Sequence, residues 1–466
     1  MNITNRIKNS QYWEVVTVSL PLVMSIAGTT VMEFTDRVFL SNYSMDAIAA
    51  SMPSGYAAFL AMTFFLGIAG YINVIIAQYT GACAEHRIGA SLWQGIYFSI
   101  FSGLLLCGIA FTGEMLFRFA GHPAEVQRLE AVYFKVLCLG GGINVLATSF
   151  SCFYSGRGLT RPVMWINTIG MLFNIPLDYA LINGVWIFPE LGIMGAGIAT
   201  VLAWSLIAIL FGIIIFTQEN NRRFGVWKNR SLDWDICRRL MKFGVPGSLQ
   251  LWLDVFAFTF FAFMVGRIGK DQLAVTNIVL SVNSLVFMPS YGFSLGLSTL
   301  TGQALGRNQP NGAIQATKST LHILMVYLLL MTIVFVFKPD WVLGFFIPDK
   351  LIPAERAAIA HIGTILLRFV VIYLFFDALY MVFVGVLKGA GDTYFIMWST
   401  GLLSFLTIVL PIYIGIEHFG LGLYFSWSCI TLFIFVSSAV SFWRFRRGKW
   451  KAMRVIEDDV KMFSKI

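Results

Sequence analysis

The sequence predicts an all-α membrane protein in which twelve transmembrane helices form two parallel six-helix lobes around a central cleft. Three observations lead to this prediction: the composition, the number of apolar spans and an internal repeat. Of the 466 residues, 58% are hydrophobic and 12% are charged, and the mean hydropathy is +0.76. In soluble domains about a quarter of the residues are charged, so this chain is expected to lie in a lipid bilayer.

Apolar runs bounded by glycine, proline and charged residues define the spans. The twelve expected spans are residues 14–40, 54–80, 92–113, 131–155, 162–183, 193–217, 240–266, 276–304, 318–338, 358–387, 394–414 and 420–443. The longest polar interruption, residues 218–242, divides the chain near its middle and is expected to tether the two lobes. We therefore assign residues 1–225 to an N-lobe and residues 226–466 to a C-lobe.

The placement of lysine and arginine predicts the orientation. Twelve spans put both termini and the central loop on one side of the membrane, and 23 of the 33 Lys and Arg residues fall there. An excess of basic residues marks the cytoplasmic side, so both termini are expected in the cytoplasm and the chain in the plasma (cell inner) membrane. Because the basic residues behind the net charge of +9 flank membrane spans, they argue against nucleic acid as a partner.

An internal repeat supports the division into two lobes. A shift of 225 residues superposes residues with special backbone or polar roles: Pro21 on Pro246, Asp46 on Asp271, Ala49 on Ala274, Gly67 on Gly292, Gln78 on Gln303 and Gly81 on Gly306. Six spans separate equivalent points, and because six is even, both halves enter the membrane in the same direction. Two such bundles face each other across a cleft, where transporters of this build hold their cargo.

The first span carries charged residues where it should be apolar. Glu33 and Arg37 lie one turn apart and are expected to neutralise each other. Asp36 points about 100° away from Arg37 and has no obvious local partner. An unpaired charge at membrane depth is costly, so Asp36 is a candidate functional residue.

A second candidate cluster lies in the fifth span. Asn174 stands one turn before Asp178, on the same helix face, and Pro176 between them removes a backbone donor, which would release the carbonyl of Leu172. Asp36 and Asp178 are expected at the same level in the outer half of the N-lobe. A carboxyl group with few other ligands favours a proton, whereas several converging oxygens favour a sodium ion, and both ions stay alternatives.

The C-lobe has its own intramembrane carboxylates. Asp254 and Asp377 fall near the middle of spans seven and ten, and Gln250 stands one turn before Asp254. A single intramembrane aspartate can have a purely structural role, as one partner of an interhelical hydrogen bond. Four of them at two matched depths favour binding sites instead.

The sequence offers no enzyme signature. Walker A and HExxH patterns are absent from it. Its six cysteines and five histidines are scattered, so no metal centre is expected beyond a sodium site.

Several stretches together resemble the multidrug and toxic compound extrusion (MATE) family. Each is short, but their order and spacing are specific. They are Pro21 to Asp36 followed by RVFL, AQYTGA from Ala77, NIPLDYALI from Asn174 followed by GAGIAT, FGVPGSLQLWLD from Phe243, and DALYMVFVGVLKGAGDT from Asp377. The resemblance covers nearly the whole chain.

This resemblance implies twelve helices in two lobes, no cofactor, and export of small organic cations in exchange for protons or sodium ions. In DinF-type relatives the matching positions Asp36, Asn174 and Asp178 form the ion site, with Thr200 as their expected neighbour. In NorM-type relatives the positions matching Asp254 and Asp377 are the important ones, although NorM relatives usually carry Glu at the first. Both sets are present here, so the subfamily stays open.

The function expected from the sequence is therefore secondary active multidrug export. The alternative within the same superfamily is a flippase for lipid-linked precursors, which would need a cationic cleft for pyrophosphate. The basic residues within the spans are few and dispersed: Arg37, Lys135 and Arg368. Their scarcity argues against a flippase, and the parallel duplication argues against a channel or receptor.

Overall fold

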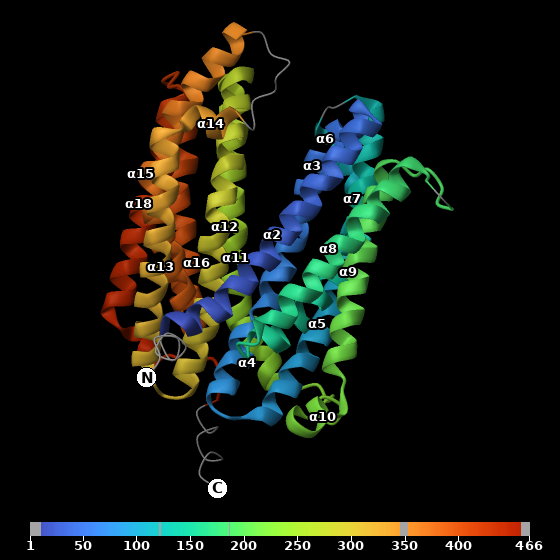
Figure 1. Cartoon of the computed structure of the whole chain (residues 1–466), viewed down its shortest axis with the longest axis vertical. Coiled ribbons are helices and arrows are strands. Elements are labelled where there is room, and N and C mark those ends of the chain that lie inside the picture. Colours follow the sequence, from blue (N-terminus) through green and yellow to red (C-terminus); the bar gives the residue numbers. More distant parts are fainter. Residues whose placement is uncertain (1–10, 121–122, 186, 345–352, 458–466) are drawn as a thin grey trace, which may run out of the picture. The chain divides into compact units, whose positions relative to one another are not determined.

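The computed structural model describes residues 11–120, 123–185, 187–344 and 353–457, and in this part of the chain the regular secondary structure is entirely helical, without a β-strand (Figure 1). A bilayer offers no water to the backbone, so a spanning segment must satisfy its own N–H and C=O groups, and a helix does so. The all-helical fold predicted from composition is confirmed.

The helices of the first half follow the predicted spans closely. They are α2 (Gln11–Tyr43), α3 (Met45–Gly70), α4 (Ile72–Gly81), α5 (Glu85–Ala110), α6 (Gly113–Ala120), α7 (Ala124–Ser155), α8 (Thr160–Asn183), α9 (Ile193–Ile215) and α10 (Gln218–Phe224). Only Tyr71 separates α3 from α4, and the two together form one span. Short polar signals set the ends: the Ser44 hydroxyl accepts from the amide of Asp46 at the start of α3, and Gly184, with φ +66°, ends α8.

The second half repeats this arrangement with longer helices. They are α11 (Trp234–Ile268), α12 (Lys270–Gly306), α13 (Pro310–Phe337), α14 (Pro339–Gly344), α15 (Pro353–Ala390), α16 (Thr393–Ser404), α17 (Leu410–Glu417) and α18 (Leu423–Arg447). A short π-helix, Phe405–Val409, joins α16 to α17 within one span.

Eleven spans in the described part of the chain are long and apolar enough to cross a membrane. The remaining predicted span, residues 162–183, corresponds to α8 (Thr160–Asn183), which is 24 residues long but is not among the eleven. At 1.5 Å per residue α8 is long enough to cross the hydrocarbon, and its polar residues lower its mean hydropathy. The less apolar helix is thus the one that carries Asn174 and Asp178.

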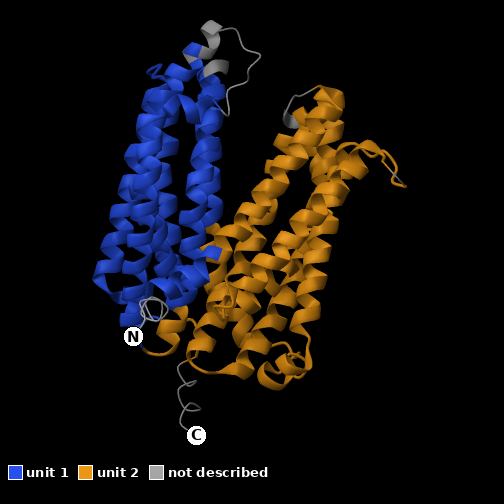
Figure 2. Ribbon diagram, in the orientation of Figure 1, with its two compact units in different colours: residues 1–20, 250–301, 309–453 blue, residues 21–249, 302–308, 454–466 orange. Residues whose placement is uncertain are grey.

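The chain forms two compact units, coloured separately in Figure 2. Unit 1 contains residues 1–20, 250–301 and 309–453, and unit 2 contains residues 21–249, 302–308 and 454–466. Three helices, α2, α11 and α12, therefore contribute residues to both units. The functional lobes expected on either side of residue 225 stay a prediction.

Unit 2 is built around α7, which packs against α3, α5 and α9. Glycines allow the backbones of α5 and α7 to approach closely. A Cβ atom on Gly142 of α7 would lie 2.6 Å from the Cα of Gly103 on α5, closer than real Cβ atoms come. In lipid the hydrophobic effect does not drive helices together. Small residues allow close van der Waals packing at the crossing, and this packing stabilises the helix pair instead.

The central loop belongs to unit 2 and packs against α5 of the same unit. Trp93 of α5 donates its indole N–H to the carbonyl of Val226 at 2.7 Å, and the Gln94 amide donates to the carbonyl of Ser231 at 3.2 Å. Both Val226 and Phe224, which ends α10, are buried. Hydropathy could not predict this docking because the loop is polar overall and its anchors are single residues.

In unit 1, α15 packs against α13 and α18. Trp427 of α18 is fully buried, meets the ring of Phe261 edge to face, and donates its indole N–H to Thr276. Each indole nitrogen in such a core needs a partner, and this one has it.

We predict that Gly142→Ala destabilises the protein by about 1–3 kcal/mol, because the added methyl forces α5 and α7 apart. The measurement is the thermal unfolding midpoint of the purified protein in detergent. Gly108→Ala is the matched control, since a Cβ at Gly108 of α5 meets nothing within 4 Å. Equal unfolding midpoints for the two variants would contradict the close crossing.

Candidate functional site

Asp36 lies on α2 within unit 2, and its surroundings match the sequence prediction. It is 6% exposed. One turn apart on the same helix, Glu33 and Arg37 form an ion pair of 3.9 Å, so Arg37 has its own partner, as predicted. The guanidinium of Arg37 also lies over the ring of Tyr56. Asp36 is left as the buried charge of this helix.

Asn174 and Asp178 of α8 are both fully buried in the same unit. Neither side chain has a hydrogen-bond partner for either of its polar atoms among the described residues. The carboxyl of Asp178 interacts electrostatically with that of Asp36. The helix continues through Pro176. The structure therefore brings together the three residues singled out in the N-lobe.

Thr200 of α9 completes this group. Its hydroxyl lies 3.3 Å from Oδ2 of Asp36 and 3.0 Å from the carbonyl of Ala196, one turn earlier on its own helix. The second oxygen of Asp36 has no partner among the described residues. Three helices thus supply one polar cluster, which we call the N-site: Asp36, Asn174, Asp178 and Thr200.

Tyr133 of α7 borders the N-site and was missed by the sequence reasoning. It is 7% exposed and interacts electrostatically with both Asp36 and Asp178. Its ring also lies beside Gly197 of α9, where a Cβ would be 3.4 Å away. A tyrosine in an apolar helix is common in packing roles, so the sequence held no signal that could have found it.

The N-site has the chemistry of a cation or proton site. Asp36 Oδ1 and both polar atoms of Asn174 and Asp178 lack partners in the described structure, and four of these five atoms are oxygens. Leaving such atoms unpaired in a buried place costs about 1–3 kcal/mol each, more for a charged group. A bound monovalent cation or a shared proton would offset that cost.

Unit 1 contains a second polar cluster, the C-site, formed by Gln250, Asp254, Tyr380, Thr400 and Asp377. The amide of Gln250 donates to the carboxyl of Asp254 one turn later, which confirms the predicted amide and carboxylate face on α11. The same amide lies 3.5 Å from the Tyr380 hydroxyl, which in turn lies 3.1 Å from that of Thr400.

Asp377 of α15 is 8% exposed and interacts electrostatically with Asp254. Among the described residues, Oε1 of Gln250 and Oδ1 of Asp254 have no partner. Tyr380 and Thr400 were not predicted, because uncharged residues such as tyrosine and threonine do not stand out in an apolar stretch of sequence. Both link the C-site to α15 and α16.

Buried carboxylates in each compact unit of a bundle of membrane-spanning helices are typical of membrane transporters. The chain belongs to the MatE family: the family model matches residues 21–180 and 246–413. The N-site and the C-site both fall largely within these matched segments. The resemblance found from sequence stretches is confirmed, and the protein is a MATE-family transporter and not an enzyme.

Relatives named as multidrug resistance proteins match over nearly the whole chain. The probable multidrug resistance protein NorM of Thermotoga maritima is 25% identical over 448 residues, which cover 95% of this chain and 94% of that protein. The probable NorM of Listeria monocytogenes is 27% identical over 450 residues, with 95% and 96% covered.

Solved structures share the fold. An outward-facing multidrug resistance MATE family transporter of the MOP superfamily superposes with a TM-score of 0.82 at 21% identity, covering 96% of this chain and 98% of its own. A eukaryotic MATE transporter gives a TM-score of 0.83 at 16% identity, covering 95% and 96%. At these identities the likeness establishes the fold alone.

We predict that Thr200→Val lowers stability by about 1–3 kcal/mol, because the near-isosteric change removes the donor to a buried carboxylate. Thr200→Ser keeps the hydroxyl and is the control. Thermal unfolding of the purified protein in detergent gives the comparison. If the valine and serine variants have the same unfolding midpoint, the Thr200 hydroxyl does not stabilise the carboxylate of Asp36.

Proposed function

We propose that this protein is a secondary active multidrug exporter that carries small organic cations and other amphipathic drugs outward in exchange for protons or sodium ions. Membership of the MatE family and similarity to probable multidrug resistance proteins support this. The observation that carries the proposal is the N-site, where buried carboxylates and an amide lack partners within the described residues.

The N-site is the proposed coupling site. Antiport requires that the bound ion and the bound cargo disfavour each other, so the ion must change the energy of the protein substantially. Loading Asp36 and Asp178 with a proton or a sodium ion removes an unfavourable buried charge. Few side chains converge there, which favours a proton.

The C-site is the proposed place for cargo or a second cation. Asp254 and Asp377 lie in one unit with Tyr380, and aromatic rings next to carboxylates suit flat organic cations. Gln250 donates to Oδ2 of Asp254, and Oδ1 of Asp254 has no partner among the described residues, so this oxygen is the proposed contact for a cation.

Both termini are proposed to lie in the cytoplasm, with the protein in the plasma (cell inner) membrane. The distribution of basic residues supports this orientation. A lipid-linked precursor flippase is disfavoured, because two of the basic residues within the spans already interact locally: Arg37 pairs with Glu33, and the Lys135 ammonium lies over the ring of Phe111 at 5.0 Å.

Ethidium transport by proteoliposomes tests the proposal. Transport driven by a pH gradient without sodium would identify a proton antiporter, and transport that needs a sodium gradient and resists a protonophore would identify a sodium antiporter. Failure with both gradients and several organic cations would overturn the proposed function.

We predict that Asp36→Asn and Asp178→Asn each abolish gradient-driven transport while the protein still folds. Asparagine keeps the shape of aspartate but can neither titrate nor hold a cation by charge. The assay is initial ethidium flux, with thermal unfolding as the folding control. Wild-type flux in either variant under a saturating gradient would remove that residue from the coupling site.

We also predict that Asp254→Asn and Asp377→Asn change the order of drug preference more than they change the response to the gradient. The test compares flux for ethidium with that for an uncharged amphipathic drug in both variants. A uniform loss for all drugs would assign the C-site to coupling instead of cargo.

A further inference from the structure

Unit 2 includes two short segments that follow the helices of unit 1 along the chain. They are residues 302–308, the end of α12, and residues 454–466, of which 454–457 are described. Both contact the last turn of α4 in unit 2, although they come from the second half of the sequence. This end of unit 2 also holds the central loop, and we call it the α4 end.

The first segment crosses α4 through a reciprocal pair of glycines. A Cβ on Gly81 would collide with the backbone carbonyl of Gln303, and a Cβ on Gly306 would collide with the backbone carbonyl of Gln78. These residues are repeat equivalents, since a shift of 225 superposes Gln78 on Gln303 and Gly81 on Gly306. The crossing is therefore the symmetric contact that a duplicated chain makes with itself.

The Gln303 side chain fastens the same segment to α7. Its amide donates to the carbonyl of Gly156, just after the end of α7, at 3.0 Å, and the side chain is 6% exposed. The contact joins one side chain to one backbone oxygen, and such a bond can break and re-form without repacking a core.

The second segment, residues 454–457, contacts the side chains of Gln78 and Tyr79. The amide of Val455 donates to Oε1 of the buried Gln78 at 2.8 Å, and the carbonyl of Val455 accepts from Arg239 of α11 at 3.2 Å. The side chains of Val455 and Ile456 are 0% and 3% exposed. Gln78 thus has one segment against its backbone and the other against its side chain.

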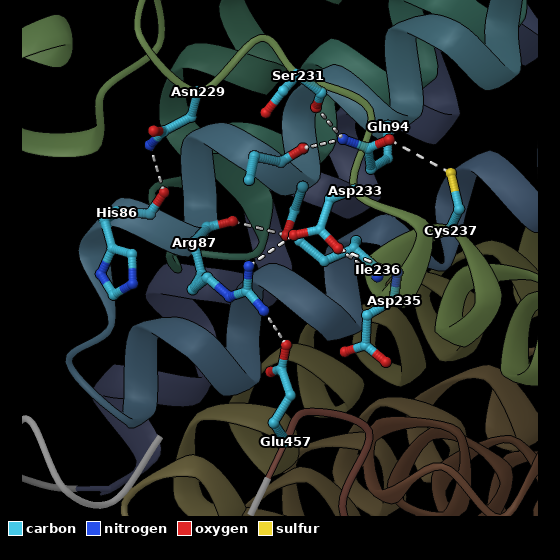
Figure 3. A network of polar contacts seen from close by, with 12 residues as sticks. His86, Arg87, Gln94, Asn229, Ser231, Asp233, Asp235, Ile236, Cys237 and Glu457 are labelled. Carbon is cyan, nitrogen blue, oxygen red and sulfur yellow. Dashed lines mark hydrogen bonds and ion pairs between the residues drawn. The ribbon is translucent and has the colours of Figure 1, made fainter. Parts of the chain in front are cut away.

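A charged network completes the attachment (Figure 3). Glu457 pairs with Arg87 of α5. Glu457 also accepts from the Tyr79 hydroxyl at 2.6 Å, a contact outside the view. Arg87 also pairs with Asp233 at 2.6 Å, and Asp233 accepts from the amide of Ile236 at the start of α11. The Arg87, Glu457 and Asp233 side chains are 26%, 17% and 23% exposed, so these pairs are less screened than surface pairs.

We propose that these two segments form a latch that is fastened to the α4 end of unit 2 in this structure, and that its release from α4 is a step of the transport cycle. A switching element needs two discrete states of similar energy. The latch has that character because a glycine crossing, single hydrogen bonds and a charged network hold it. The proposal rests on the proposed transport function only for its place in the cycle.

A cysteine-accessibility experiment tests the latch without requiring transport. The reporter is Ser155→Cys, a near-isosteric change at the end of α7, where Ser155 is 7% exposed and stands next to Gly156. It is placed in a full-length protein whose six natural cysteines, all free, are replaced by alanine. The measurement is the rate of labelling by a hydrophilic maleimide in nanodiscs.

Two variants weaken the latch in different ways. Glu457→Gln removes the charge that pairs with Arg87, and Gly306→Ala puts a methyl group against the Gln78 carbonyl. The matched controls are Glu190→Gln, since Glu190 accepts from the Tyr43 hydroxyl at 2.9 Å elsewhere in unit 2, and Gly108→Ala, which has open space around it.

The expected result is labelling about fivefold faster for Glu457→Gln, the change that the loss of about one ordinary hydrogen bond produces, since glutamine can still accept from Arg87, and faster still for Gly306→Ala. Both controls should label at the reporter's own rate. Unchanged labelling in Glu457→Gln, or an equal rise in the controls, overturns the latch. If Gly306→Ala fails to fold, Glu457→Gln alone decides.

The labelling result also separates this proposal from the proposed function. A protein that moves no drug under any gradient, yet labels faster when Glu457 is neutralised, has the latch and lacks the transport function. A protein that exports drugs, yet labels at one rate in all variants, has the function and lacks the latch.

Discussion

The cost of burying polar groups away from water is the constraint on which the rest of this structure depends. The backbone meets it by forming helices almost everywhere, which satisfies the N–H and C=O groups internally. The side chains meet it only in part. Asp36, Asn174 and Asp178 retain polar atoms without partners in the described structure. These atoms are therefore available to a partner that comes and goes, such as a proton or a cation.

Much of the fold could be predicted because hydropathy is a local property. Each apolar run reports its own length, and the matched spans and the family assignment confirm that reasoning. The charged and amide members of both sites were also visible, since Asp36, Asp178 and Gln250 interrupt apolar runs. Tyr133 and Tyr380 escaped because tyrosine is as common in packing as in binding, and only a tertiary structure distinguishes the two.

The assignment of helix ends to compact units could not be predicted from the sequence. The repeat places a division near residue 225, whereas α2, α11 and α12 each contribute to both units. Which neighbour a helix end meets depends on long-range contacts such as the Gly81 crossing, and a periodic pattern contains no information about a partner that is more than 200 residues away. A helix shared by two units is also a direct mechanical connection between a site in one and an event in the other.

The docked tail has a consequence for how the protein is made. Residues 21–249 are synthesised first, and membrane domains generally begin to fold as they emerge. Arg87 and Tyr79 nevertheless meet Glu457 only after α18 has been translated and inserted. The ribosome must finish nearly the whole chain before the first-made half can reach its final form, so premature termination would leave that half incomplete and exposed to proteolytic quality control.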